Sequence, residues 1–245
     1  MSLEADARRR LASVRERIAR AAERVGRDPG EITLVGVAKR QSLERVRATV
    51  AAGLRVLGEN FVQDAREMRE RLAGEQDGEG SQSSVELVWR MVGRLQRNKL
   101  ALAVRIFDVI ESVDRIELVA PLAKHAADAN RVLDVLVQIN VGDEAQKGGA
   151  RFDDAPELAR AIAAQPSLRM CGWMAVPPAG EDPEASRPHF RRLRAFRDAW
   201  SEQDPGLARG DLSMGMSNDF EVAVEEGATL VRVGTALFGP RIDLP

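Results

Sequence analysis

The sequence lacks features that several large classes of protein need. Its single cysteine, Cys171, excludes an internal disulfide and weakly favours a reducing compartment. With His125 and His189 as the only histidines, a zinc cluster is not expected. Lysine and arginine number 36 against 38 acidic residues, so the net charge of -2 offers no basic surface for binding nucleic acid.

Long hydrophobic runs are also absent. The longest apolar stretches, such as 132–141, are far shorter than the roughly 20 residues that span a bilayer, and the N-terminus is charged rather than signal-like. We therefore expect no membrane association and a cytoplasmic location. A chain of 245 residues has room for one large α/β domain or two small ones.

Strand and helix patterns alternate along the chain. Residues 3–25 carry apolar side chains at helical spacing, which predicts an additional N-terminal helix within 1–26. After it, short runs rich in β-branched residues alternate with amphipathic stretches. The predicted strands are 32–38, 56–58, 87–92, 107–110, 132–141, 169–175, 211–214 and 230–233.

Strands that are separated by helices favour a closed barrel. Right-handed crossovers lay such strands parallel, and eight parallel strands of this kind suggest a (β/α)8 TIM-type barrel. The alternative is an open, doubly wound sheet, although the first strand and turn lack the Gly-x-Gly-x-x-Gly pattern of a dinucleotide fold. We predict an α/β protein with one barrel domain over 1–245 and a mobile Gly/Ser-rich loop at 74–84.

Polar residues stand where such a barrel places its chemistry. Reactive groups lie at the C-terminal ends of strands, and phosphate is commonly held by the loops after strands seven and eight. Lys39 ends the first strand, and the loop after the seventh contains Met216 and Ser217. Gly234 and Thr235 follow the eighth strand. Taken singly, each feature is also explained as a rim charge, a helix cap or a turn.

Closure of the barrel joins these features. The first strand then lies beside the eighth, which borders the seventh, so Lys39 and both candidate phosphate loops share one corner of the mouth. A lysine beside a phosphate site suits an aldehyde cofactor, because its amine can attack the carbonyl while the phosphate anchors the ligand. A Schiff-base aldolase that binds a sugar phosphate is an alternative use of the same residues.

Several segments carry a family resemblance. They are Leu-Val-Gly-Val-Ala-Lys at 34–39, Gly-Glu-Asn-Phe-Val-Gln at 58–63, and the segments 89–99, 212–217 and 231–239. In these segments the chain resembles the pyridoxal 5'-phosphate (PLP) homeostasis protein family, also called the YggS or proline synthase co-transcribed family. The resemblance implies PLP as the cofactor and an alanine-racemase-like barrel of fold type III.

The resemblance also implies roles for individual residues. Lys39 would carry the PLP aldimine. The other cofactor-binding residues would be Asn60, Met216, Ser217, Arg232, Gly234 and Thr235. Among them the serine, the glycine and the threonine would hold the phosphate, and the asparagine would line the ring pocket. Arg232 would face the pyridine nitrogen, where a guanidinium cannot accept the ring proton and so leaves the ring a weaker electron sink.

Two positions depart from the family pattern. The family usually has histidine after the tryptophan, where this chain has Arg90. Its usual Gly-Pro-Leu-Gln-Ser-Asn-Lys becomes Gly-Arg-Leu-Gln-Arg-Asn-Lys at 93–99, so any role of that histidine is open here. Lys147, in the loop after the fifth strand, is a candidate to accept PLP during handover, although a flexible polar loop explains it as well.

The resemblance also bears on catalysis. Related amino acid racemases use a proton donor on each cofactor face, commonly a lysine and a tyrosine from a second β domain of a partner subunit. This sequence has no tyrosine, and the short stretch after Thr235 leaves no room for that domain. We expect a non-catalytic, metal-free monomer that maintains vitamin B6 homeostasis and delivers PLP to apoenzymes. The alternative is a weak racemase or decarboxylase with water or Asn60 as the second base.

Overall fold

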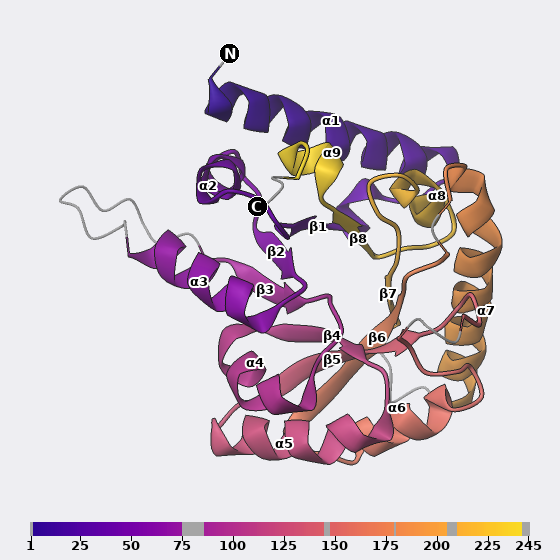
Figure 1. Cartoon of the computed structure of the whole chain (residues 1–245). Helices are drawn as coiled ribbons and strands as arrows, with labels where there is room; N and C mark the ends of the chain where they lie inside the picture. The colour runs from indigo at the N-terminus through magenta and orange to yellow at the C-terminus, as the bar shows by residue number, and fades with distance from the viewer. Residues whose placement is uncertain (1, 75–85, 145–147, 179, 205–209, 242–245) are drawn as a thin grey trace.

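Parallel strands close into a barrel at the centre of the molecule (Figure 1). The computed structural model describes residues 2–74, 86–144, 148–178, 180–204 and 210–241. Every strand within these ranges pairs in parallel with its sequence neighbours, and β1 pairs with β8 to complete the ring. The strands are β1 (Thr33–Val37), β2 (Val56–Glu59), β3 (Val88–Met91), β4 (Val109–Val113), β5 (Leu133–Ile139), β6 (Leu168–Ala175), β7 (Asp211–Ser213) and β8 (Leu230–Val233). The predicted (β/α)8 barrel is confirmed, and the open sheet is excluded.

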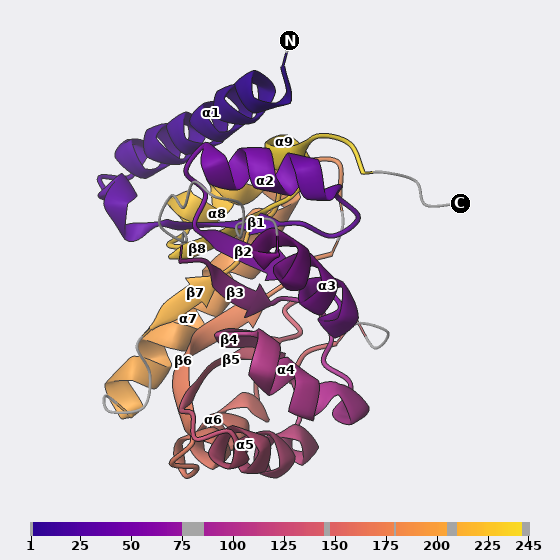
Figure 2. The ribbon, with the colours of Figure 1, turned by 90° about the vertical axis from the view of Figure 1, so that its left-hand side faces the viewer.

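Helices connect the strands and surround the barrel (Figures 1 and 2). They are α2 (Leu43–Ala51), α3 (Val62–Ala73), α4 (Leu100–Ile106), α5 (Val119–Asp128), α6 (Ala155–Ala163), α7 (Arg187–Gln203), α8 (Phe220–Glu225) and α9 (Thr235–Phe238), with short 3-10 turns at Pro29–Glu31, Arg97–Lys99, Ile116–Leu118 and Pro183–Ser186. Each amphipathic pattern buries one face; in α6 this face is Ala155, Leu158, Ala159 and Ile162. No helix in the described ranges is long and apolar enough to cross a membrane.

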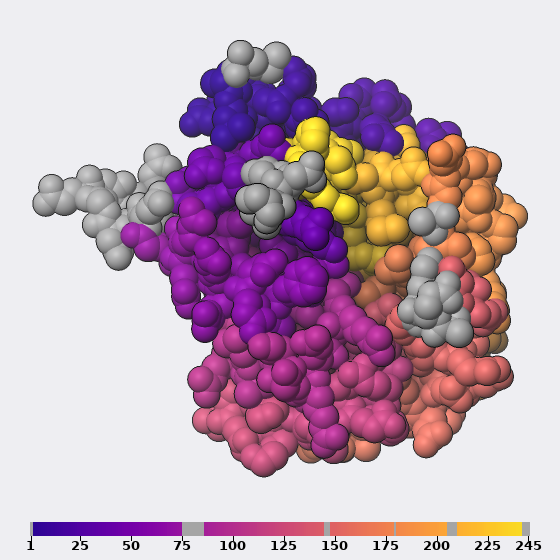
Figure 3. Space-filling view, in the orientation of Figure 1, coloured from indigo at the N-terminus to yellow at the C-terminus, as the bar shows by residue number. Residues whose placement is uncertain are grey.

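The predicted N-terminal helix is α1 (Leu3–Arg24), which packs across α2, α8 and α9 and forms a ridge along one edge of the surface (Figures 1 and 3). Ser2 is its N-cap residue, and the Ser2 side chain accepts a hydrogen bond from the Ala5 backbone N–H. Its buried stripe consists of Ala7, Leu11, Val14, Ile18, Ala21 and Ala22. Burying each large aliphatic side chain contributes about 1.5–3 kcal/mol. This helix therefore covers the outside of the barrel beside β1 and β8.

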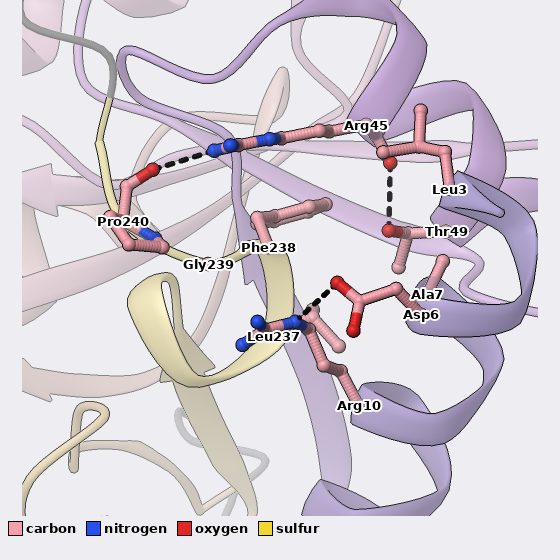
Figure 4. A pocket seen from close by; sticks show the side chains of 10 residues that line it. All are labelled: Leu3, Asp6, Ala7, Arg10, Arg45, Thr49, Leu237, Phe238, Gly239 and Pro240. Carbon is pink, nitrogen blue, oxygen red and sulfur yellow. Dashed lines mark hydrogen bonds and ion pairs between the residues drawn. The ribbon is translucent and has the colours of Figure 1, made fainter. Parts of the chain in front are cut away.

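The C-terminal segment is tied to α2 at the edge of this helix (Figure 4). The Arg45 guanidinium donates to the Pro240 carbonyl oxygen at 2.6 Å, and the Gln41 amide donates to the Gly239 carbonyl oxygen at 3.2 Å. In the same region Arg10 pairs with Asp6 at 2.8 Å. The bonds of Arg45 and Gln41 hold the chain that follows β8 against the start of the helix that follows β1.

Two sequence predictions fall outside the described residues. The predicted loop 74–84 lies within 75–85 except for Gly74, which ends α3. Lys147 belongs to 145–147.

Candidate functional site

A cavity of about 350 Å³ opens where the C-terminal ends of β7, β8, β1 and β2 meet. Its wall consists of Val37, Lys39, Gln41, Asn60, Val92, Val176, Met216, Ser217, Asn218, Arg232, Gly234, Thr235 and Arg241. Every site residue predicted from the sequence, from Lys39 to Thr235, is in this wall. The volume suits a small ligand.

The turn after β1 directs Lys39 into the cavity. The Ala38 N–H donates to the Gly58 carbonyl at 3.0 Å, and the Gln41 N–H returns to the Ala38 carbonyl at 2.9 Å. Between them Arg40 has a φ of 55°, a left-handed conformation that favours glycine. Such conformations cost on the order of 1 kcal/mol and persist where the surrounding contacts impose them. The Lys39 Nζ lies 5.5 Å from the centroid of the Phe61 ring.

The loops after β7 and β8 meet through one hydroxyl. Ser217 Oγ accepts hydrogen bonds from the backbone N–H groups of Gly234 at 3.2 Å and Ala236 at 3.4 Å. A Cβ at Gly234 would lie 3.3 Å from the Val37 carbonyl oxygen, so a side chain there would crowd the turn. The arrangement gathers backbone N–H donors and a hydroxyl at one corner of the cavity, and these are the groups that bind phosphate.

The loop after β7 is held in shape from its other side. Asp219 Oδ1 accepts a hydrogen bond from the Met216 N–H at 2.7 Å, and Asp219 Oδ2 accepts one from the Ser186 hydroxyl at 2.7 Å. Gly215 has a φ of 91°, and a Cβ at this position would lie 2.5 Å from the Cβ of Ala223. Glycine is therefore required at this position, because any side chain would be strained by the backbone conformation and would clash with α8.

Arg232 lies deep in the cavity wall and is 4% exposed. Its Nη1 donates to Ser213 Oγ at 2.6 Å, and its Nη2 donates to the Ala175 carbonyl at 2.7 Å. Burial lowers the pKa of the Arg232 guanidinium from its ordinary value, while the Glu111 and Asp219 carboxylates oppose this shift. A guanidinium has only donors, so this wall offers N–H groups to a ligand acceptor atom.

Arg90, which stands where the family usually has histidine, does not line the cavity. Its side chain is buried and forms an ion pair with Glu111 on β4. Glu59, at the end of β2, is a second buried carboxyl beside the site, and its Oε2 accepts the Asn60 N–H at 3.3 Å. Burial raises the pKa of Glu59 to about 8.

Sequence reasoning missed several residues of the wall. Gln41 and Asn218 add amide groups; the Asn218 amide donates to the carbonyls of Gly180 and Glu181, both at 3.2 Å. Arg241 adds a cation near the two loops. Its position two residues after the matched segment 231–239 is a signal that could have identified it.

The fold and the site define a barrel of the alanine racemase type, and the family model "Alanine racemase, N-terminal domain" matches residues 10–242. More narrowly, a relative named "Pyridoxal phosphate homeostasis protein" from Aquifex aeolicus is 41% identical over 232 residues, covering 95% of this chain and 97% of its own. A relative of the same name from Pseudomonas aeruginosa is 38% identical, covering 94% of both chains. The chain belongs to the pyridoxal phosphate homeostasis protein family, as its sequence motifs predicted.

A solved structure agrees with this assignment. PipY from Synechococcus elongatus, with PLP bound, is 31% identical to this chain and superimposes with a TM-score of 0.78, covering 95% of this chain and all of the PipY chain.

Proposed function

We propose that this protein binds PLP in the cavity and holds it for PLP homeostasis without catalysing a reaction. The observation that carries the proposal is the convergence of an amine, two loops with hydroxyl and backbone N–H groups, and a buried guanidinium in one cavity. The PLP-bound structure of PipY and the shared name of the relatives support it.

The residues present fit PLP group by group. Bound PLP supplies an aldehyde, and Lys39 provides the amine that would attach to it. Ser217, Gly234 and Thr235 would hold the phosphate, with Arg241 as an additional positive charge. Arg232 would donate to the ring nitrogen. Asn60 and Met216 would complete the wall around the ring.

The composition of the wall supports storage rather than turnover. Racemisation needs a proton donor and acceptor on each face of the bound substrate. Among the described lining residues, Lys39 is the one group suited to that task, because the wall otherwise consists of amide, hydroxyl, guanidinium and apolar side chains. Arg232 cannot accept a proton from the ring, which further disfavours carbanion chemistry.

The proposal extends to delivery. A monomeric carrier in the cytoplasm would load PLP reversibly and release it to apoenzymes, since attachment to an amine is a reversible bond. Incubation of the PLP-loaded protein with a PLP-dependent apoenzyme should restore its activity. If no activity returns while free PLP restores it, the delivery role is wrong.

Binding itself is tested by absorption spectroscopy. Addition of PLP should produce a visible band that borohydride abolishes, and peptide mapping should then find the reduced label on Lys39. The Lys39→Ala variant should take no label. A protein that stays colourless with PLP would favour the sugar-phosphate aldolase. Deuterium incorporation at an amino acid Cα, lost in Lys39→Ala, would contradict a purely non-catalytic role.

A further inference from the structure

A buried polar network lies directly behind the cavity wall. The side chain of Glu111, on β4, is completely buried and its carboxylate accepts hydrogen bonds on both oxygens. Arg90 Nε donates to Oε1, and the Ser213 hydroxyl donates to Oε2 at 2.5 Å. Ser213 Oγ in turn accepts from Arg232 Nη1 at 2.6 Å. The chain of contacts runs from β3 through β4 and β7 to β8.

The direction of these hydrogen bonds follows from the charges. A hydroxyl has one proton, and Ser213 donates it in a hydrogen bond to the Glu111 carboxylate. The lone pairs of Ser213 Oγ are then left to accept the hydrogen bond from Arg232. The Arg232 Nη1 also lies 3.9 Å from Glu111 Oε2. With Nη2 anchored on the Ala175 carbonyl, the guanidinium is fixed at both of its terminal nitrogens. Its orientation toward the cavity is therefore set by groups outside the cavity.

A buried carboxylate is costly unless a cation balances it. Arg90 supplies that cation next to Glu111 and is itself buried. A histidine at this position would have an ordinary pKa of about 6.5 and would be largely neutral at pH 7. Arginine keeps its charge throughout the physiological range. Arg90 thus gives Glu111 a counter-charge on its Oε1 side, opposite the side that faces Ser213 and Arg232.

We propose that Arg90 and Glu111 form a positioning pair that orients Arg232, through Ser213, for its contact with the ligand ring. The role rests on the proposed function, in which Arg232 donates to the ring nitrogen of PLP. Neither Arg90 nor Glu111 lines the cavity, so both act through other residues. Their removal should alter how tightly PLP is held and the electronic environment of its ring.

The test compares PLP binding by wild type, Ser213→Ala and Glu111→Gln in absorbance titrations. Ser213→Ala removes one hydroxyl and leaves the Arg90–Glu111 pair intact. We expect it to raise the Kd for PLP about tenfold, as loss of a charge-assisted hydrogen bond does, and to shift the absorption band of bound PLP and its pH profile. Glu111→Gln should act in the same direction and more strongly. Arg90→His should reproduce part of the effect at pH 8 and less of it at pH 5.5, where histidine is charged.

Glu226→Gln is the matched control. Glu226 is another buried carboxylate held by arginines, Arg187 at 2.8 Å and Arg191 at 3.0 Å, but it precedes β8 at the N-terminal side of the barrel. Its loss should lower stability and leave the Kd and the spectrum of bound PLP unchanged.

The outcomes separate two failures. If wild type binds no PLP, the proposed function is wrong. If wild type binds PLP and folded Ser213→Ala binds it with the same Kd and the same band, the positioning role is wrong. If Glu111→Gln does not fold, Ser213→Ala decides the question. The role is also wrong if Glu226→Gln shifts the absorption band of bound PLP as much as Ser213→Ala does. The shift would then follow from the loss of any buried polar group and not from the orientation of Arg232.

Discussion

Replacing Glu59 with glutamine should stabilise the protein at alkaline pH, and the gain should disappear in acid. Glu59 is the last residue of β2 and is 1% exposed. Burial, with a smaller contribution from the nearby Asp64 carboxylate, raises its pKa from an ordinary 4.5 to about 8. The Asn60 N–H and the charge of Lys39 act in the opposite direction and are too weak to cancel the burial.

The sign and size of the effect follow from proton linkage. Between about pH 4.5 and pH 8 the folded protein keeps a proton on Glu59 that the unfolded chain has lost. The stability that depends on Glu59 is therefore complete below this window, falls as pH rises through it, and is constant above it. At about 1.4 kcal/mol per pH unit, Glu59→Gln should gain roughly 3 kcal/mol over wild type between pH 5 and pH 8.

The assay is urea unfolding of both proteins at pH 5, 6.5 and 8, followed by circular dichroism. The control is Glu67→Gln on α3, where the replaced carboxylate is 71% exposed and the difference from wild type should stay within about 0.5 kcal/mol at each pH. Equal differences between Glu59→Gln and wild type at pH 5 and pH 8 would refute the reasoning, because Glu59 would then titrate alike in both states.

Three further substitutions test the site and the packing. Ser217→Ala removes the hydroxyl that accepts from the Gly234 N–H, and we expect about tenfold weaker PLP binding in an absorbance titration. Gly93→Ala would place a Cβ 2.3 Å from the Asn60 carbonyl oxygen, so it should lower the free energy of unfolding by roughly 2 kcal/mol and weaken PLP binding. Leu11→Ala in α1 should cost about 3 kcal/mol of stability in urea unfolding and leave the Kd for PLP unchanged.

Each of the three has an outcome that contradicts it. Wild-type affinity in Ser217→Ala would remove Ser217 from the phosphate site. A Gly93→Ala protein with unchanged stability and affinity would show that the Asn60 turn can shift freely. A Leu11→Ala protein that is as stable as wild type would mean that α1 contributes little to the packed core.

The general course of the barrel could be predicted because its signals are local. Short β-branched runs alternate with amphipathic stretches, and this order leads to a parallel sheet with helices outside. The predicted strand 107–110 is nevertheless offset from β4 (Val109–Val113), and the four-residue helix α9 was not predicted. Segments this short carry too few residues for a periodic signal.

The buried network behind Arg232 could not be predicted, for a physical reason. All residues of β4 are buried, so the alternation that separates inward from outward side chains gives no signal there. The register between β4 and β5 also shifts between Ile110 and Val113. Only the folded strand shows that Glu111 points toward Ser213 and Arg232.

The sequence by itself determined which chemical groups end each strand: an amine after β1, a hydroxyl and a glycine in the loops after β7 and β8, and a guanidinium within β8. Strand order and parallel direction then bring those groups together, because closure makes the first and last strands neighbours. Tertiary structure alone decided which buried side chains form hydrogen bonds and ion pairs with the groups that line the cavity. Contacts such as Arg90 with Glu111 depend on register and on the direction of each side chain, which residues distant in sequence establish only when the barrel closes.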